Sequence, residues 1–138
     1  MTVKTVNLSE IAEINPPLGV YLSDCEEVSF VPMAAFSEVT ASVVAEEARQ
    51  FGQVKKGFTG FRSGDVIFAK ITPCFENGKI GQANISRGYG FGSTEFHVLR
   101  PRPQVLDGRY LHHFLRQPRI RVEGQRRMTG SGGQRRVP

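Results

Sequence analysis

The C-terminal third of this 138-residue chain concentrates guanidinium groups. Between Arg109 and Arg136 there are eight arginines and one acidic residue, Glu123. The arginine side chain is a planar fork of donors that forms two hydrogen bonds at once to a phosphate or to the edge of guanine. A helix carrying so many like charges repels itself unless something neutralises it. The region indicates contact with an anionic partner, with a solvated helix face as the alternative.

A second polar cluster surrounds an expected turn in the segment ITPCFENGK, residues 71–79. Thr72-Pro73 should end a strand, and Asn77-Gly78 is a strong turn signal. The loop then presents side chains that can meet phosphates and base edges. These are Thr72, Glu76, Asn77 and Lys79. A structural hairpin whose polar groups satisfy its own backbone explains the same residues equally well.

Other reactive residues do not assemble into a catalytic pattern. Asn15-Pro16-Pro17-Leu18 is similar to a motif of adenine-N6 methyltransferases, but it lacks the aromatic residue and no glycine-rich cofactor loop accompanies it. The prolines more simply end a helix. Gly88, Gly90 and Gly92 lack the Rossmann spacing and the helix that should follow it, so they predict a tight turn.

Metal binding is equally unsupported. Neighbouring residues on a helix point about 100° apart, so His112 and His113 cannot easily face one ion. Cys25 and Cys74 fit neither a metal spacing nor a small disulfide framework, and we expect reduced thiols. The sequence therefore predicts no enzymatic activity, no metal and no nucleotide cofactor.

Charge is divided unevenly along the chain, whose formal net charge is +5. Residues 1–50 hold eight acidic and two basic side chains, whereas residues 51–138 hold sixteen basic and five acidic ones. Such a division predicts one face turned toward an anion and one turned away. The side chains expected on the basic face are Arg62, Lys70, Lys79, Arg127, Arg135 and Arg136.

Hydrophobic patterning predicts a single α+β domain. A short helix should start near Asn7 and stop at Asn15-Pro16-Pro17, with an apolar face formed by Leu8, Ile11, Ala12 and Ile14. The segment 28–36 is β-rich, and Pro32 favours an edge strand or a bulge. Residues 40–50 are ambiguous between helix and strand, and the pattern is β from Phe51 onward.

The second half should begin with strands and end with helices. Residues 66–71 predict a buried strand, and residues 79–85 and 91–99 predict two more, joined by a hairpin at 87–90. Tyr110, Leu111, Phe114 and Leu115 form a helical stripe that Asp107 can cap. Pro118 should begin a basic helix at 119–128, followed by a glycine-rich tail. The fold class expected is a twisted, mostly antiparallel β-sheet or partial barrel with an N-terminal helix and C-terminal helices.

The chain contains several long motifs: KITPCFENGKI (70–80), GFGSTEFHVLRP (90–101), YLHHFLRQ (110–117) and MTGSGGQRRVP (128–138), with VSFVPMAAFSE (28–38) and FRSGDVIFAKI (61–71) in support. Together they closely resemble one family, the target-recognition domains of type I restriction–modification specificity subunits. The resemblance implies that residues 1–138 form one domain reading half of a bipartite duplex target. It further implies methyltransferase subunits and a restriction translocase–nuclease subunit as partners. On this resemblance we expect residues 1–138 to lack the spacer helix and second recognition domain of the family, and we see no coiled-coil heptad run among them.

Within that resemblance, the motif hydroxyls suit phosphate contacts, and the loops 49–62 and 87–89 are the expected base readers. The candidate DNA-binding residues are Lys55, Lys56, Arg62, Lys70, Thr72, Asn77, Lys79, Arg87, Tyr89, Ser93, Thr94, Arg127, Thr129, Ser131, Gln134, Arg135 and Arg136. The competing hypothesis is a basic single-stranded nucleic-acid binder, which needs exposed aromatic rings such as Phe58, Phe61 and Tyr89. No stretch reaches the ~18 apolar residues of a membrane span, and we expect a cytoplasmic protein.

Overall fold

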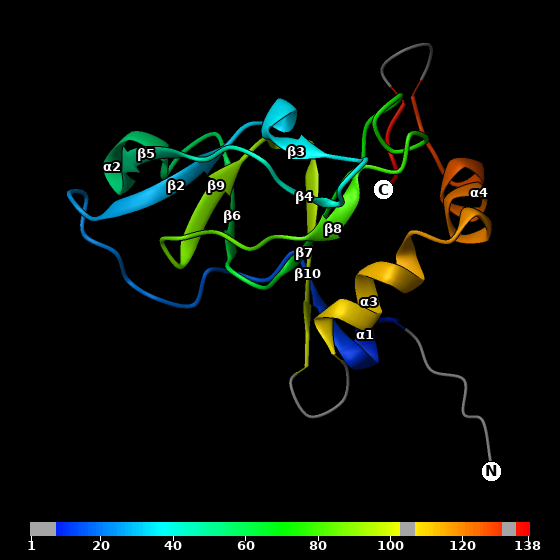
Figure 1. The fold of residues 1–138 in the computed structure, drawn as a ribbon, viewed down its shortest axis with the longest axis horizontal. Coiled ribbons are helices and arrows are strands. Elements are labelled where there is room, and N and C mark those ends of the chain that lie inside the picture. Colours follow the sequence, from blue (N-terminus) through cyan, green and yellow to red (C-terminus); the bar gives the residue numbers. More distant parts are fainter. Residues whose placement is uncertain (1–7, 103–106, 131–134) are drawn as a thin grey trace.

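The computed structural model describes residues 8–102, 107–130 and 135–138. Figure 1 shows the order of the elements along the chain. The first part of the chain contains α1 (Leu8–Ile11), β1 (Ala12–Ile14), β2 (Glu27–Val31), the 3-10 turn η1 (Met33–Ala35), β3 (Phe36–Ser37), β4 (Ser42–Val43), β5 (Glu47–Gln50) and α2 (Phe51–Val54). The remainder contains β6 (Thr59–Arg62), β7 (Val66–Ala69), β8 (Ile80–Gln82), β9 (Tyr89–Gly92), β10 (Phe96–Pro101), α3 (Gly108–Leu115) and α4 (Pro118–Arg126).

Most of the described strands form two four-stranded sheets. One sheet has the order β1-β10-β7-β8 and the other has the order β5-β2-β9-β6, while β3 and β4 pair separately. All the strand pairs are antiparallel except β2 with β9, where Ser29 lies opposite Gly90. The expected α+β fold with mostly antiparallel strands is confirmed. The strands are divided between two sheets, and they do not close into a barrel.

Three apolar clusters hold the elements together. The central cluster joins the two sheets and includes Val31 and Phe61 from one and Ile67 and Phe96 from the other. A second cluster lies under α3, where Leu111 and Leu115 pack on Val66 and Leu99. The third lies under α2, where Val54 meets Leu22, Val28 and Phe91. Each of the two sheets is therefore anchored to its own helix, the first to α3 and the second to α2.

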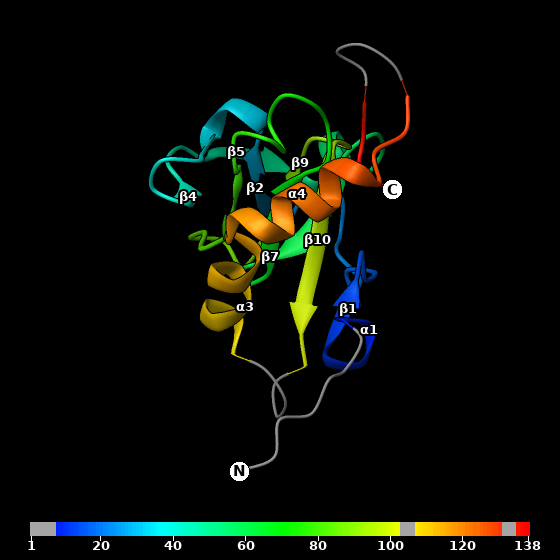
Figure 2. The same ribbon diagram turned by 90° about the vertical axis from the view of Figure 1, so that its right-hand side faces the viewer.

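The two C-terminal helices lie over the face of the first sheet that is turned away from the central cluster (Figures 1 and 2). The predicted stripe holds for Leu111 and Leu115, which are buried, whereas Tyr110 is exposed. Pro118 is the first residue of α4, as expected. Gly124 lets α4 approach the 72–79 loop, because a Cβ there would lie 2.3 Å from the Phe75 ring. The predicted turn is also confirmed at Gly78, whose φ is 78°.

Three sequence predictions for the first part of the chain, up to Val54, were wrong. The helix ends at Ile11, and Ala12–Ile14 pairs with β10 instead, which leaves Ile14 half exposed. Asn15 closes this pairing, because its side chain binds the Val98 N–H and the His97 ring. Phe51–Val54 is helical because Gln50 and Gln53 form a reciprocal capping box. The proline at position 32 follows β2, which is an internal strand.

The expected hairpin at 87–90 was also wrong. Strands β8 and β9 belong to different sheets, so the residues between them cross from one sheet to the other. The strand expected at 91–99 is broken into β9 and β10 for a local reason. The Ser93 hydroxyl accepts the Glu95 N–H, and the Phe96 N–H bonds the Ser93 carbonyl, so the chain turns between the two strands.

Candidate nucleic-acid interface

Three of the family-like motifs meet at one end of the molecule, beside α4. The Lys70 N–H bonds the Glu95 carbonyl, and the Val137 N–H bonds the Lys70 carbonyl. Thr129 and Arg136 exchange two backbone hydrogen bonds of 2.9 Å. The segments around residues 70, 95 and 136 thus form one small framework, although the sequence separates them widely.

The framework is held by an ion pair and a half-buried imidazole. Arg136 donates to both oxygens of Glu95, and this hydrogen bonding lowers the pKa of the Glu95 carboxyl. The His97 Nε2 lies 2.9 Å from the Val137 carbonyl. Partial burial lowers the pKa of His97 below its ordinary value. Lys70 lies close enough to influence both groups.

The 72–79 loop is largely occupied by contacts within the protein. The Thr72 hydroxyl bonds the Glu76 carboxylate, and the Lys79 ammonium donates to the Met33 carbonyl and faces Glu38. Two arginines hold the loop backbone from outside. Arg116 binds the carbonyls of residues 78 and 80, and Arg121 binds the carbonyl of residue 76. In this loop Asn77 is the exposed polar side chain among the predicted residues.

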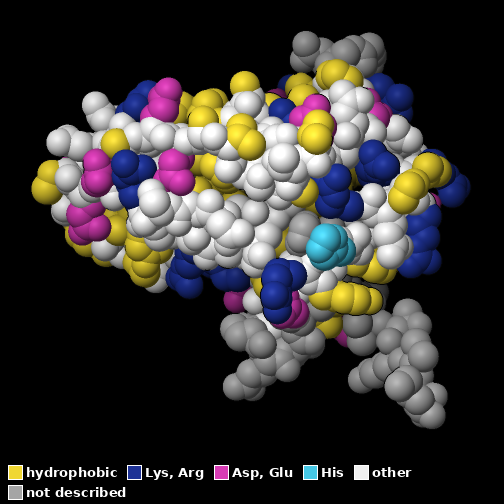
Figure 3. All heavy atoms as spheres, in the orientation of Figure 1, with side chains coloured by type: hydrophobic (Ala, Val, Ile, Leu, Met, Phe, Trp, Pro, Cys, Tyr) yellow, Lys and Arg dark blue, Asp and Glu magenta, His cyan; other side chains and the backbone are white. Residues whose placement is uncertain are grey.

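A group of arginines projects into solvent from the same end. Figure 3 shows basic side chains gathered over the region of α3 and α4. Arg126 and Arg127 are about three-quarters exposed, and both pair with Glu123. The single charge of Glu123 cannot neutralise two guanidinium groups. Arg119 lies over the Phe114 ring, 5.8 Å from its centroid. We call the exposed members the cationic end: Arg109, Arg119, Arg126, Arg127 and Arg135.

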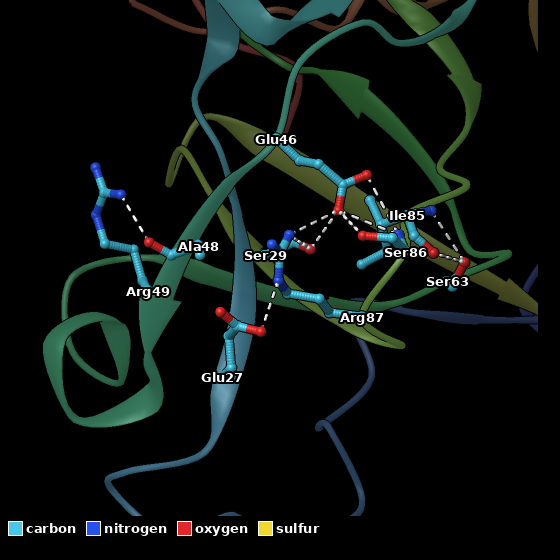
Figure 4. Close-up of polar contacts among 9 residues, drawn as sticks. All are labelled: Glu27, Ser29, Glu46, Ala48, Arg49, Ser63, Ile85, Ser86 and Arg87. Carbon is cyan, nitrogen blue, oxygen red and sulfur yellow. Dashed lines mark hydrogen bonds and ion pairs between the residues drawn. The ribbon is translucent and has the colours of Figure 1, made fainter.

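The opposite end of the molecule is organised around Glu46 (Figure 4). Its carboxylate accepts hydrogen bonds from the Ser29 hydroxyl at 2.6 Å, from the N–H and hydroxyl of Ser86, and from Arg87. Burial raises the pKa of Glu46, but these hydrogen bonds and the Arg87 charge outweigh it, so the pKa is lowered overall. Glu27 approaches the Nε of Arg87 at 3.3 Å. Arg87 is therefore enclosed by acidic and hydroxyl groups.

The other predicted residues in this region differ in their availability. Lys55 pairs with Asp24 at 3.0 Å, and Arg62 donates twice to the Leu18 carbonyl. Tyr89 is half-buried against the third core cluster. Lys56 is exposed and, within the residues the structure covers, has no assigned ion pair or hydrogen bond.

The structure thus brings together Lys70, Thr129, Arg135 and Arg136, with Ser93 and Thr94 on the adjoining turn. Arg62, Arg87 and Tyr89 lie apart from them, in or beside the second sheet. Ser131 and Gln134 lie outside the described residues. The candidate set omitted Arg109, Arg119 and Arg126, although the density of arginine in the C-terminal run was a signal for them.

The described residues contain no group of three or more potential metal ligands. None of the helices there has the length and hydropathy needed to cross a bilayer.

The sequence of this chain is similar to those of known proteins. No protein-family model matches the chain. Over 134 residues the chain is 44% identical to the specificity subunit of the type I restriction enzyme EcoEI from Escherichia coli, covering 96% of this chain and 22% of that subunit. Over 132 residues it is 42% identical to the EcoAI specificity subunit from Escherichia coli, covering 95% of this chain and 22% of that subunit. The chain thus spans about a fifth of the length of these relatives.

Solved structures share the fold. A chain from a study of complex assembly and conformational transition in the type I R-M system superposes with a TM-score of 0.74 at 19% identity, covering 96% of this chain and 34% of that chain. The HsdS subunit from Thermoanaerobacter tengcongensis superposes with a TM-score of 0.70 at 21% identity, covering 95% of this chain and 34% of that chain.

The fold is that of a domain found in type I restriction–modification subunits. The chain itself is homologous to the type I specificity subunits over one segment of their length, and it fits a target-recognition domain of such a subunit.

Proposed function

We propose that this chain is a non-catalytic DNA-recognition domain that binds double-stranded DNA and reads one half of a bipartite target. The observation that carries the proposal is the cationic end, where five arginines project from α3, α4 and the C-terminal segment. Phosphate neutralisation by such side chains supplies the sequence-independent part of DNA affinity. The homology to specificity subunits supports duplex DNA as the anion.

The three aromatic side chains expected to stack bases, Phe58, Phe61 and Tyr89, do not favour single-stranded nucleic acid. Binders of that class stack bases on exposed rings interleaved with basic residues. Phe61 is fully buried, Tyr89 is half-buried, and Phe58 is 39% exposed with its ring edge-on to Phe30. The three rings therefore form no open stacking platform.

The partners follow from the same family. We infer that the domain works in the cytoplasm within a larger assembly, in which methyltransferase subunits modify adenine and a translocase–nuclease subunit cuts DNA. In that arrangement the domain selects the sequence and performs no chemistry. Linking it to a second recognition domain would raise affinity, because the second contact becomes intramolecular.

The proposal is tested by fluorescence anisotropy on a duplex and on a matched single strand at several salt concentrations. If roughly four to six basic side chains meet phosphates, log affinity should fall with log salt at a slope of roughly −4 to −5. The duplex should bind more tightly than the single strand at every salt concentration. A slope near zero for the duplex, or preference for the single strand, would refute duplex recognition.

A further inference from the structure

A polar hollow lies at the end of the molecule opposite the cationic end. It has a volume of about 390 Å³ and is lined by Cys25, Glu27, Ala48, Arg49, Gln50 and Gln53. We call it the tip hollow. The residues come from β2 and the turn before it, from β5 and from α2, which Figure 1 places at the far end of the long axis from α3 and α4.

The guanidinium of Arg49 is held in a defined position at this hollow. Its Cζ atom lies over the Phe30 ring, 5.1 Å from the centroid. Nη1 donates to the Ala48 carbonyl at 2.9 Å, and Nη2 pairs with Glu47. In Figure 4 Arg49 points away from the Glu46 cluster. A side chain fixed in this way loses little conformational entropy when it binds a ligand.

Two amide groups beside Arg49 are also oriented. The Gln53 amide oxygen accepts the Gln50 N–H at 3.0 Å, and the Gln50 side chain accepts the Gln53 N–H in return. With both amide oxygens engaged by the backbone, the amide NH₂ groups remain as donors. Val54 anchors this short segment in the third core cluster, so the donors sit on a packed support.

The charges around the tip hollow largely cancel in pairs. Asp24 meets Lys55, Glu27 meets Arg87 and Glu47 meets Arg49. A surface of this kind attracts phosphates weakly, in contrast to the cationic end. Beside the exposed carboxylates of Glu27 and Glu47, it presents the donors of Arg49, Gln50 and Gln53. Such donors match the edge of guanine, because guanine presents the acceptors O6 and N7 in the major groove.

We propose that the tip hollow reads a guanine in duplex DNA, with Arg49 donating to the base edge and Gln50 and Gln53 supplying neighbouring donors. The inference rests on the proposed function, because it assigns base reading to one end of a duplex-binding domain. The cationic end then supplies affinity, and the tip hollow supplies part of the sequence choice.

The test selects bound duplexes from a randomised pool and then measures affinities by anisotropy, using the wild type, Arg49→Ala, Arg49→Lys and Lys56→Ala. The wild type should prefer guanine at one position by about 5- to 150-fold over other bases. Arg49→Ala should lose that preference. Arg49→Lys should lose most of it, because the ammonium cannot form the two parallel bonds. Lys56→Ala is the matched control at the same end, and it should weaken binding to every duplex alike while keeping the preference.

The outcomes separate the two proposals. Selection of a conserved guanine that Arg49→Ala and Arg49→Lys both retain would overturn the assignment of the tip hollow and leave duplex binding intact. Selection of no guanine at all would do the same. Failure of the wild type to bind any duplex would instead refute the proposed function, and the assignment with it. Thermal unfolding of each variant checks folding, and Arg49→Lys decides the question if Arg49→Ala does not fold.

Discussion

The guanidinium of Arg136 holds the carboxylate of Glu95 in a forked ion pair, with Nη2 2.8 Å from Oε1 and Nε 2.8 Å from Oε2. Its neighbour Arg135 is exposed and makes one long hydrogen bond of 3.4 Å, to the Gln125 carbonyl. Adjacent arginines that look equivalent in the sequence therefore have different environments. One supports the C-terminal framework, and the other is available to a ligand.

This difference predicts unequal effects on DNA binding. Arg135→Ala should flatten the salt dependence by about 0.9 in slope, the amount expected for one phosphate contact. Arg136→Ala should flatten the slope less and should loosen the segment around residue 136. Anisotropy titrations at several salt concentrations, with thermal unfolding in parallel, measure both quantities. Equal flattening by the two variants would contradict the assignment.

The half-buried His97 ring predicts a loss of stability in mild acid. Burial lowers its pKa in the folded state from the ordinary value of 6.5, so the unfolded chain takes up the proton more readily. Its contribution to stability is present above pH 6.5 and decreases as the pH falls from there toward the folded-state pKa. Urea unfolding across this range should show the decrease in the wild type.

A His97→Gln variant should have a flatter stability profile in that range. The Glu95 carboxylate provides an internal contrast. Its pKa is lowered by the Arg136 hydrogen bond, so its contribution persists until the pH falls below the ordinary value of 4.5. The wild type and the His97→Gln variant should therefore both lose stability in stronger acid. An unchanged slope in mild acid for His97→Gln would show that another group titrates there.

The pair formed by Asp65 and Arg100 predicts a large loss of stability. Asp65 is 3% exposed, and Arg100 donates to its two oxygens at 2.9 and 2.8 Å. Removing the arginine leaves a buried carboxylate without its partner, which typically costs about 3–5 kcal/mol. Arg100→Ala should lower the free energy of unfolding by about that amount in urea titrations.

Arg102→Ala is the matched control for this pair. Arg102 lies 3.9 Å from Glu13 with both side chains about half exposed. Exposed pairs contribute about 0–1 kcal/mol, so the control should be nearly neutral. Similar losses for Arg100→Ala and Arg102→Ala would mean that water reaches Asp65.

The Glu46 cluster predicts coupled mutational effects. Glu46→Ala removes the acceptor of the Ser29 hydroxyl, which belongs to a fully buried residue, and should cost about 1–3 kcal/mol. Ser29→Ala in the Glu46→Ala background should then cost less than it does in the wild type, because the hydroxyl has already lost that partner. A double-mutant cycle by urea unfolding measures the difference. Strict additivity would show that the two residues act independently.

Local patterns predicted the parts of the fold that local chemistry determines. The stripe at Leu111 and Leu115, the proline that starts α4 and the turn at Gly78 all depend on residues close together in the chain. The division into two sheets does not depend on such neighbouring residues. Whether β9 pairs with β8, the strand just before it, or with β2 and β6 depends on contacts across the whole molecule, so the hairpin prediction failed.

The candidate site shows the same limit. The arginine-rich run indicated a cationic surface, but charge alone does not distinguish an exposed Arg126 from an Arg116 that binds backbone carbonyls. Nor can it show that Arg87 is enclosed by Glu46 and Glu27. The predicted base-reading loop 49–62 includes Arg49, Gln50 and Gln53 of the tip hollow. The hollow itself could not be predicted, because its proximity to Glu27 depends on how β2 and β5 pair.

The pairing of β1 with β10 has a consequence for synthesis of the chain. Ile14 lies opposite Leu99, so about 85 residues must be added after the first strand is made before its partner exists. At about 5–20 residues per second, this wait lasts roughly 4–17 s. Strand β2 can pair early with β5, but it waits similarly for β9, its parallel neighbour. The acidic N-terminal part of the nascent chain thus leaves the ribosome with β1 unpaired and β2 lacking one neighbour, and neither sheet can be completed until most of the domain has been translated.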